Sequence, residues 1–208
     1  MKKLLTTTIA VLLILAAQAE VKLPRFFSDN MVLQQQTECN LWGTADANKQ
    51  VKVRTSWDNR QYKTTAATDG HWQLKVQTPA AGGPYTISFN DGKETLLENI
   101  LIGEVWICSG QSNMEMQMKG FKQQPVEGTT EELLRCRDGQ LRLFTVKRNA
   151  SLTPVDSVTG KWNEANSASV RDFSATAYYF GRALRQTLDV PVGLIVTSWG
   201  GSACEAWM

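Results

Sequence analysis

The sequence predicts a two-part fold, in which an all-β region is followed by a parallel α/β region. From Glu20 to about Asn99, apolar residues alternate with polar ones, which is typical of half-buried strands. After Ile100 the period changes, and continuous apolar runs alternate with helical patterns. Such an order of strands and helices favours parallel pairing in an α/β sheet.

Short alternating stretches make up the first region. The clearest of them are QVKVRTSW (50–57), HWQLKVQ (71–77) and YTISF (85–89). Stretches typical of turns separate or follow them: TDG (68–70), AAGGP (80–84) and NDGK (90–93). Short strands about ten residues apart with no helical pattern between them favour a β-sandwich.

Three apolar runs predict the strands of the second region. They are EVWIC (104–108), LRLFTV (141–146) and GLIVTSW (193–199). We expect EVWIC to be buried on both faces, because its apolar residues are continuous.

Two helices are expected between these strands. One opens with Thr129 three residues before Glu132, a capping-box spacing, and closes at Gly139. The other covers 174–189 and ends before Pro191. In this second helix the apolar face is expected to hold Phe180, Leu184 and Leu188.

Three parallel strands make a small sheet, since sheets commonly have about five or six. The chain also stops at Met208, shortly after Gly200-Gly201, where another helix is expected to start. We therefore expect this chain to be the N-terminal part of a longer protein. The alternative is a natural short domain that completes its sheet by dimerisation.

The first 19 residues resemble a secretory signal peptide. Lys2 and Lys3 precede an apolar stretch (9–17), and Ala17-Gln18-Ala19 has the small-x-small pattern of a cleavage site. The stretch is shorter than the roughly 20 residues of a membrane-spanning helix, although an anchor is the alternative. Export predicts a periplasmic or extracellular protein. Without the two lysines, the 22 basic residues become 20 and balance the 20 acidic ones, which argues against nucleic-acid or membrane binding.

Four cysteines are present, Cys39, Cys108, Cys136 and Cys204. Their spacings are far too wide for a zinc ribbon, and no metal site is expected. If they form disulfides, three connectivities are possible, and the sequence does not choose among them. Two of them, Cys108 and Cys204, lie at apolar strand ends, where a free thiol behaves as a small hydrophobe. We expect free thiols.

The stretch SGQSNM (109–114) directly follows the first predicted parallel strand, and Gly200-Gly201 follows the third. Sites in α/β sheets form at the carboxyl ends of strands, so both turns are expected to open on one edge of the sheet. There Ser112 can be a nucleophile, with backbone N–H groups stabilising the oxyanion of acyl transfer. It can also be an ordinary turn residue, with Ser112 or Asn113 capping the next helix.

EVWICSGQSNMEM (104–116) resembles the nucleophile block of the sialate O-acetylesterase family, serine esterases of the SGNH-hydrolase group that deacetylate sugars. Two further segments are similar to this family: 23–35, to the opening of its β-domain, and 173–207, to the segment leading into its second block. The resemblance covers nearly all of the chain after residue 19. It implies a β-sandwich over 20–99 and an incomplete SGNH-like (flavodoxin-like) parallel α/β/α domain over 100–208.

Carried onto this sequence, the resemblance implies that Ser112 is the nucleophile and that its own N–H is one oxyanion donor. Gly201 would supply the next donor, with Gly200 as the alternative, and Gln111 and Asn113 would shape the turn. The implied substrate is an O-acetylated carbohydrate, and no metal or organic cofactor is implied.

The family's acid and base come from a later Asp-x-x-His segment that this sequence does not contain. The only histidine, His71, is expected to begin a strand in the β region, and Glu205 to be a carboxylate at a helix N-terminus. A serine hydroxyl is a weak nucleophile without a base, so we expect little esterase activity from this chain alone. The alternative function is a non-catalytic carbohydrate-binding or scaffold protein. Its β region would offer tryptophan faces to sugars, although such residues are more often core: Trp42, Trp57 and Trp72.

Overall fold

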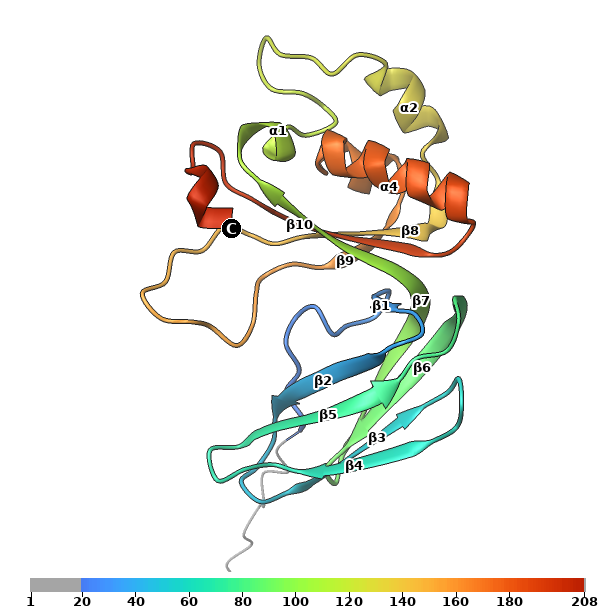
Figure 1. Cartoon of the computed structure of the whole chain (residues 1–208), viewed down its shortest axis with the longest axis vertical. Coiled ribbons are helices and arrows are strands. Elements are labelled where there is room, and N and C mark those ends of the chain that lie inside the picture. Colours follow the sequence, from blue (N-terminus) through green and yellow to red (C-terminus); the bar gives the residue numbers. More distant parts are fainter. Residues whose placement is uncertain (1–19, 208) are drawn as a thin grey trace, which may run out of the picture.

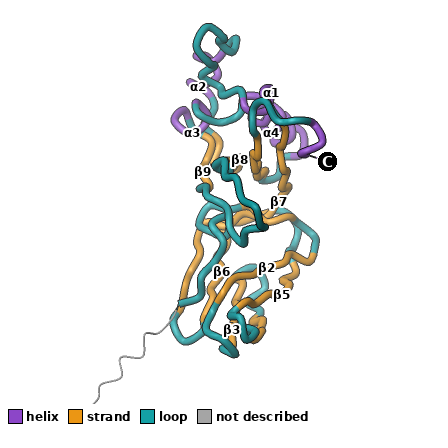
Figure 2. Tube along the Cα trace, turned by 90° about the vertical axis from the view of Figure 1, so that its left-hand side faces the viewer, coloured by secondary structure: helices purple, strands orange, loops and turns teal. Residues whose placement is uncertain are grey.

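The computed structural model describes residues 20–207, and one strand runs through both regions of the molecule. This strand, β7 (Glu94–Gly110), is 17 residues long (Figure 1). Its first half pairs with β6 (Gly82–Asn90) and β1 (Val32–Gln34), and its second half pairs in parallel with β10 (Val192–Ser198). Figure 2 shows the two regions stacked along the long axis of the molecule, with β7 passing between them.

The β-rich region contains two sheets that share one core. β7 continues through β6 to β3 (Gln50–Thr55) and β4 (Gln61–Thr65), while β2 (Glu38–Thr44) and β5 (His71–Gln77) form a separate antiparallel pair. The predicted alternation is confirmed, because inward residues of both sheets are buried in the same cluster, among them Leu41, Val51, Val53, Trp72, Val76, Ile87 and Phe89. AAGGP is not wholly a turn. Its last three residues belong to β6, where the pairing register shifts.

The second region has the parallel core that the sequence predicts. The order is β7-β10-β8, with β8 (Asp138–Thr145) parallel to β10, and β9 (Trp162–Ala165) added antiparallel at the edge. The helices are α1 (Ser112–Glu115), α2 (Thr129–Arg135), α3 (Ser167–Arg171) and α4 (Ala175–Leu188), with a 3₁₀ turn at Cys204–Trp207.

The α-helices of the described residues lie over one face of these strands (Figure 1). Buried residues of α3 and α4 share a core with Leu194 and Val196 of β10. On the opposite face, Phe144 and Trp162 belong to the core of the β-rich region. Over residues 20–207, the predicted α/β/α layering is therefore present on one face only.

The structure corrects two details of the first predicted helix, its capping box and its end. α2 begins at Thr129, after Gly128 with a left-handed backbone, and the Thr129 hydroxyl donates to backbone carbonyls rather than capping the helix. This helix ends at Arg135, so Gly139 lies inside β8.

α4 ends before Pro191 as predicted. Of the three residues expected on its apolar face, only Leu184 packs against the core. Ala175, Ala177, Tyr178 and Gly181 are buried, whereas Phe180 and Leu188 are exposed. Small residues face β10 because the helix lies close to the strand. A side chain at Gly181 would collide with Leu194.

The prediction that EVWIC is buried on both faces is wrong for two of its residues. Trp106 is 42% exposed and Ile107 is 70% exposed. Within the described residues, only β10 pairs with this half of β7, so the strand is an edge strand there. Trp106 lies on the helix side and packs edge-on against Phe180, with ring centroids 5.2 Å apart.

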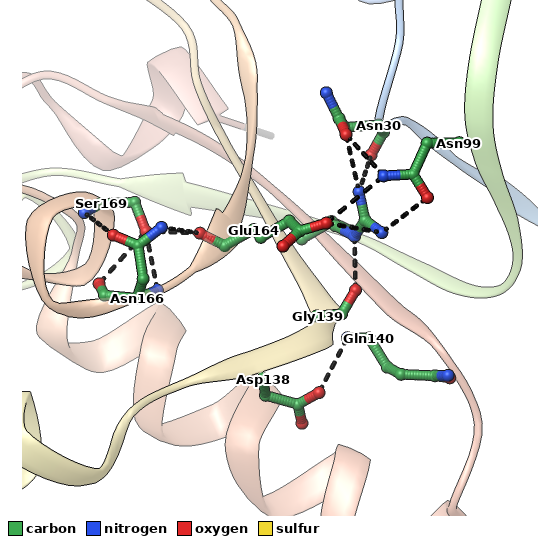
Figure 3. Close-up of polar contacts among 9 residues, drawn as sticks. Asn30, Asn99, Asp138, Gly139, Gln140, Glu164, Asn166 and Ser169 are labelled. Carbon is green, nitrogen blue, oxygen red and sulfur yellow. Dashed lines mark hydrogen bonds and ion pairs between the residues drawn. The ribbon is translucent and has the colours of Figure 1, made fainter.

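A buried arginine joins the two regions. Arg142 of β8 is 3% exposed and donates to the Asn30 side chain at 3.1 Å and to the Asn99 side chain at 3.3 Å. It also pairs with Glu164 of β9 at 3.3 Å, and its Nε donates to the Gly139 carbonyl at 2.6 Å (Figure 3). Burial lowers the pKa of Arg142, and the nearby carboxylates act against this. The cluster ties the N-terminal segment and the bend of β7 to the α/β strands.

The boundary expected between residues 99 and 100 falls inside β7, so a division at that point stays a prediction. Pairing of β7 passes from β1 and β6 to β10 between Gly103 and Glu104.

The predicted signal peptide, 1–19, lies outside the described residues. Within them, no helix has the length and apolar character needed to cross a membrane.

All four cysteines are free thiols in the structure, as predicted.

The three tryptophans of the β region differ in their burial. Trp72 is buried in the core, and Trp57 packs on Tyr85 and donates to a backbone carbonyl. Trp42 is half-buried, with its ring against Phe26 and Phe27.

Candidate functional site

The turns after β7 and β10 begin side by side. Ser198 is the register partner of Gly110, and the Trp199 N–H donates to the Gly110 carbonyl at 3.0 Å. Ser112 follows Gly110 by two residues, and Gly200 follows Ser198 by two. The structure therefore confirms that the serine turn and the Gly-Gly turn open on the same edge of the sheet (Figure 1).

Ser112 is exposed and is the first residue of α1. Its hydroxyl donates to Gln111 Oε1 at 2.6 Å, and its N–H donates to the same oxygen at 3.1 Å. Gln111 thus caps α1, in agreement with a turn-shaping role. The Asn113 carbonyl accepts a hydrogen bond from the Thr176 hydroxyl, which ties the turn to α4.

The Gln111 oxygen therefore lies next to the two Ser112 groups that acyl transfer would use. A substrate oxyanion bound by the Ser112 N–H must take the place of this oxygen. The Gln111 side chain has to turn away before substrate binds in that way.

Gly200 and Gly201 are not equivalent. The Gly200 N–H donates to Glu115 Oε2 at 2.6 Å, so it is already engaged. A side chain at this position would collide with the Glu115 carboxylate. Gly201 has φ +80°, which favours glycine, and within residues 20–207 no acceptor is recorded for its N–H. Of the two predicted oxyanion donors, Gly201 is the one with an uncommitted amide.

Glu115 and Arg148 brace the Gly-Gly turn, and neither was predicted from the sequence as a site residue. Glu115 forms an ion pair with Arg148, whose guanidinium lies over the Trp199 ring at 5.7 Å. One carboxylate thus joins α1, the turn after β10 and the segment after β8. Glu115 stands one helical turn after Ser112, a spacing that could have drawn attention to it. Arg148 has no local signal, because it reaches the site only through folding.

The Ser202 hydroxyl closes the same turn. It donates to the Trp199 carbonyl at 2.7 Å and accepts from Trp207 Nε1 at 2.8 Å. Glu205 lies exposed in the first turn of the following 3₁₀ segment.

A cavity of about 200 Å³ lies behind α1, at the carboxyl ends of β8 and β10. Both signs of charge line it, from Glu115 and Asp172 and from Lys147 and Arg148. Ser112 is not among its lining residues. In the described part of the chain, no group of three His, Cys, Asp or Glu side chains is placed to hold a metal ion.

The structure does not bring His71 to Ser112. His71 begins β5, as predicted, and its Nε2 lies 3.9 Å from Asp156 Oδ2. β5 and α1 lie in opposite halves of the molecule (Figure 1). Among residues 20–207, the one recorded hydrogen-bond partner of the Ser112 hydroxyl is Gln111. Among the described residues, no recorded hydrogen bond therefore joins the Ser112 hydroxyl to a base.

The chain is similar in sequence and fold to known carbohydrate acetylesterases. Over 88% of its length the chain is 29% identical to sialate O-acetylesterase of Homo sapiens and 28% identical to that of Rattus norvegicus. A crystal structure described as a novel carbohydrate acetylesterase from Xanthomonas citri matches 91% of the chain with a TM-score of 0.84 and 34% identity. No protein-family model matches.

The predicted resemblance to the sialate O-acetylesterases is thus confirmed, and the chain is homologous to them. It spans 38% and 36% of the two curated relatives and 43% of the solved chain. The mixed α/β fold is shared with the solved acetylesterase.

Proposed function

We propose that this chain carries the nucleophile half of an exported carbohydrate O-acetylesterase. The register of β7 and β10 supports this best, because it sets Ser112 beside a Gly-Gly turn with a free amide. A serine that only capped a helix would not require a free backbone amide on the neighbouring turn. The homologues named as sialate and carbohydrate acetylesterases support ester hydrolysis on a sugar.

In the proposed reaction, Ser112 Oγ attacks the carbonyl carbon of an acetyl ester while a base takes the hydroxyl proton. The oxyanion receives hydrogen bonds from the Ser112 and Gly201 N–H groups. The sugar oxygen leaves with a proton and an acetyl-serine remains. Water then attacks this ester, and acetate leaves as Ser112 regains its proton.

The base in this proposal comes from residues outside these 208. Two observations support it: the described residues place no base at Ser112, and the chain spans about two fifths of its relatives. The Glu115 carboxylate is already paired with Arg148 and the Gly200 N–H. Its role here is to hold the Gly-Gly turn against α1.

The experiment compares the 208-residue chain with the protein translated from the whole reading frame. Acetate release is measured from O-acetylated sialic acid and from O-acetylated oligosaccharides. We expect hydrolysis by the longer protein, loss of at least about 1000-fold in its Ser112→Ala variant, and little hydrolysis by the short chain. Robust hydrolysis of p-nitrophenyl acetate by the short chain, abolished in Ser112→Ala, would disprove the external base. Full activity in Ser112→Ala of the longer protein would disprove the nucleophile.

Export is the second part of the proposal. It rests on the charged start, apolar stretch and small-x-small pattern of residues 1–19. Expression in a bacterial host followed by cell fractionation tests it. Mass spectrometry of the exported protein should show an N-terminus at Glu20, and retention of Met1 on a cytosolic protein would contradict it.

A further inference from the structure

A groove far from the serine turn lies between the outer face of the β2–β5 pair and the neighbouring β4. Trp42 and Gln73 are register partners on this face, with their sequence neighbours Leu41 and Trp72 turned inward. Two adjoining cavities of about 510 Å³ and about 150 Å³ share Trp42 and His71 as lining residues. They form one groove, which we call the Trp42 groove.

The lining of the larger cavity combines an aromatic ring with neutral polar groups. Trp42 is half-buried, and Gln73, His71, Thr64 and Thr65 line the same cavity. An indole offers a flat apolar face, and these side chains both donate and accept hydrogen bonds. A pyranose ring has the matching surface, with C–H groups on its face and hydroxyls at its rim.

The smaller cavity adds one carboxylate and one ammonium group. Asp156 lies 3.9 Å from His71 Nε2, and Lys22 lines the same cavity. Within these two cavities the opposite charges balance, so the Trp42 groove has no cationic cluster that would select an anionic sugar chain. This balance favours a neutral glycan.

The groove continues toward the serine turn along the segment between β8 and β9. Ser157 lines both the smaller cavity and a third one of about 230 Å³, and its hydroxyl accepts the Arg25 N–H at 3.0 Å. The third cavity reaches Trp199 and shares Lys147 and Arg148 with the cavity behind α1. Neighbouring cavities that share lining residues suit an extended chain of sugars better than a single sugar. The two cations of the third cavity, Lys147 and Arg148, lie outside the Trp42 groove, and Arg148 is paired with Glu115.

We propose that the Trp42 groove is a binding site for a neutral oligosaccharide, with Trp42 stacking on one sugar ring and Gln73 and His71 bonding to its hydroxyls. Binding there needs no chemistry at Ser112, so the site is independent of the proposed esterase reaction.

Calorimetric titration of the full chain tests this site. The probes are cellohexaose, xylohexaose and mannohexaose, with a hexamer of sialic acid as the anionic probe. All proteins carry Ser112→Ala, which separates binding from hydrolysis. We expect at least one neutral hexaose to bind. Trp42→Ala should weaken it about tenfold, and Gln73→Ala and His71→Ala about threefold each.

Trp106→Ala is the matched control, because Trp106 is also a partly exposed tryptophan but lies on β7 outside the groove. It should leave the affinity unchanged. If Trp42→Ala fails to fold by circular dichroism, the exposed Gln73 and His71 variants decide the test. Binding of no neutral hexaose, equal affinity of the groove variants and Trp106→Ala, or preference for the sialic acid hexamer would each overturn the proposal.

Discussion

The two halves of β7 have similar apolar sequences and opposite environments. In the first half, Ile100, Leu101 and Ile102 are buried between β1 and β6 and the core of the β-rich region. In the second half, Trp106 and Ile107 are exposed, because only β10 pairs with that half among the described residues. An apolar run therefore predicts a strand, but the number of its neighbours decides how much of it is buried.

The same contrast separates the two regions. The β-rich region closes its core between two sheets. Over residues 20–207, the parallel strands carry helices on one face and have an uncovered edge at β7. The candidate site lies in this less enclosed region, where ion pairs and backbone hydrogen bonds hold the turns in place. Substitutions along β7 and at Arg142, which joins the two regions, test this difference in burial.

The largest difference is expected between two isoleucines of β7. Ile102→Ala should lower the free energy of unfolding by about 4 kcal/mol, because it leaves a cavity in a fully buried site. Ile107→Ala should cost about 0.5 kcal/mol or less, since its side chain is mostly in solvent. Urea unfolding followed by circular dichroism measures both. Equal losses would show that a partner buries this edge in solution.

Arg142→Ala should lower the free energy of unfolding by about 3 kcal/mol. Removing the buried guanidinium takes the recorded donor from Asn99 Oδ1 and one of two donors from Asn30 Oδ1, and it breaks the link between the regions. Arg171→Ala is the control, because Arg171 and its partner Asp172 are about half-exposed and such pairs contribute little. If both variants unfold at the same urea concentration, the junction does not depend on Arg142.

Tyr178→Phe should lower the free energy of unfolding by about 1 kcal/mol at pH 7, because the Tyr178 hydroxyl donates a hydrogen bond to Glu132 Oε1 at 2.6 Å. Burial acts to raise the Glu132 pKa, but hydrogen bonds from Tyr178 and Arg182 outweigh it and lower that pKa. The resulting stability is present above the unfolded pKa of about 4.3 and is lost as the pH falls through the lower folded pKa.

The difference in the free energy of unfolding between wild type and Tyr178→Phe should therefore be largest near pH 7 and should decrease below about pH 4. Urea midpoints at both pH values measure it. An unchanged gap would mean that the hydrogen bond does not depend on the Glu132 charge.

The smallest effect concerns thiol reactivity, which should differ with burial. Burial raises the pKa of Cys108 and of Cys136, so few of these thiols ionise at pH 8. Cys204 is exposed and should react at least about tenfold faster with Ellman's reagent. Cys204→Ser should remove the fast phase. A fast phase that persists in this variant would show that the parallel region opens in solution.

Much of the fold follows from local patterns. Alternating apolar residues predict strands with one face on a core, as in β3, β5 and β6. Continuous apolar runs predict strands that are buried on both faces, as expected for β8 and β10. The helix predictions were weaker. Residues at helical spacing can face β10 or solvent, and close packing on Leu194 selected the small residues of α4 instead of Phe180.

The sequence by itself determined that Ser112 and Gly200-Gly201 each follow a strand, since strand ends and turns depend on adjacent residues. Only the tertiary structure decided that β10 lies next to β7, which half of β7 is buried, and that Glu115 engages Gly200 and Arg148. The contacts of β7 with β10 and of Glu115 with Gly200 and Arg148 join residues 33 to 88 positions apart. Their existence depends on the packing of whole strands, which no local pattern records.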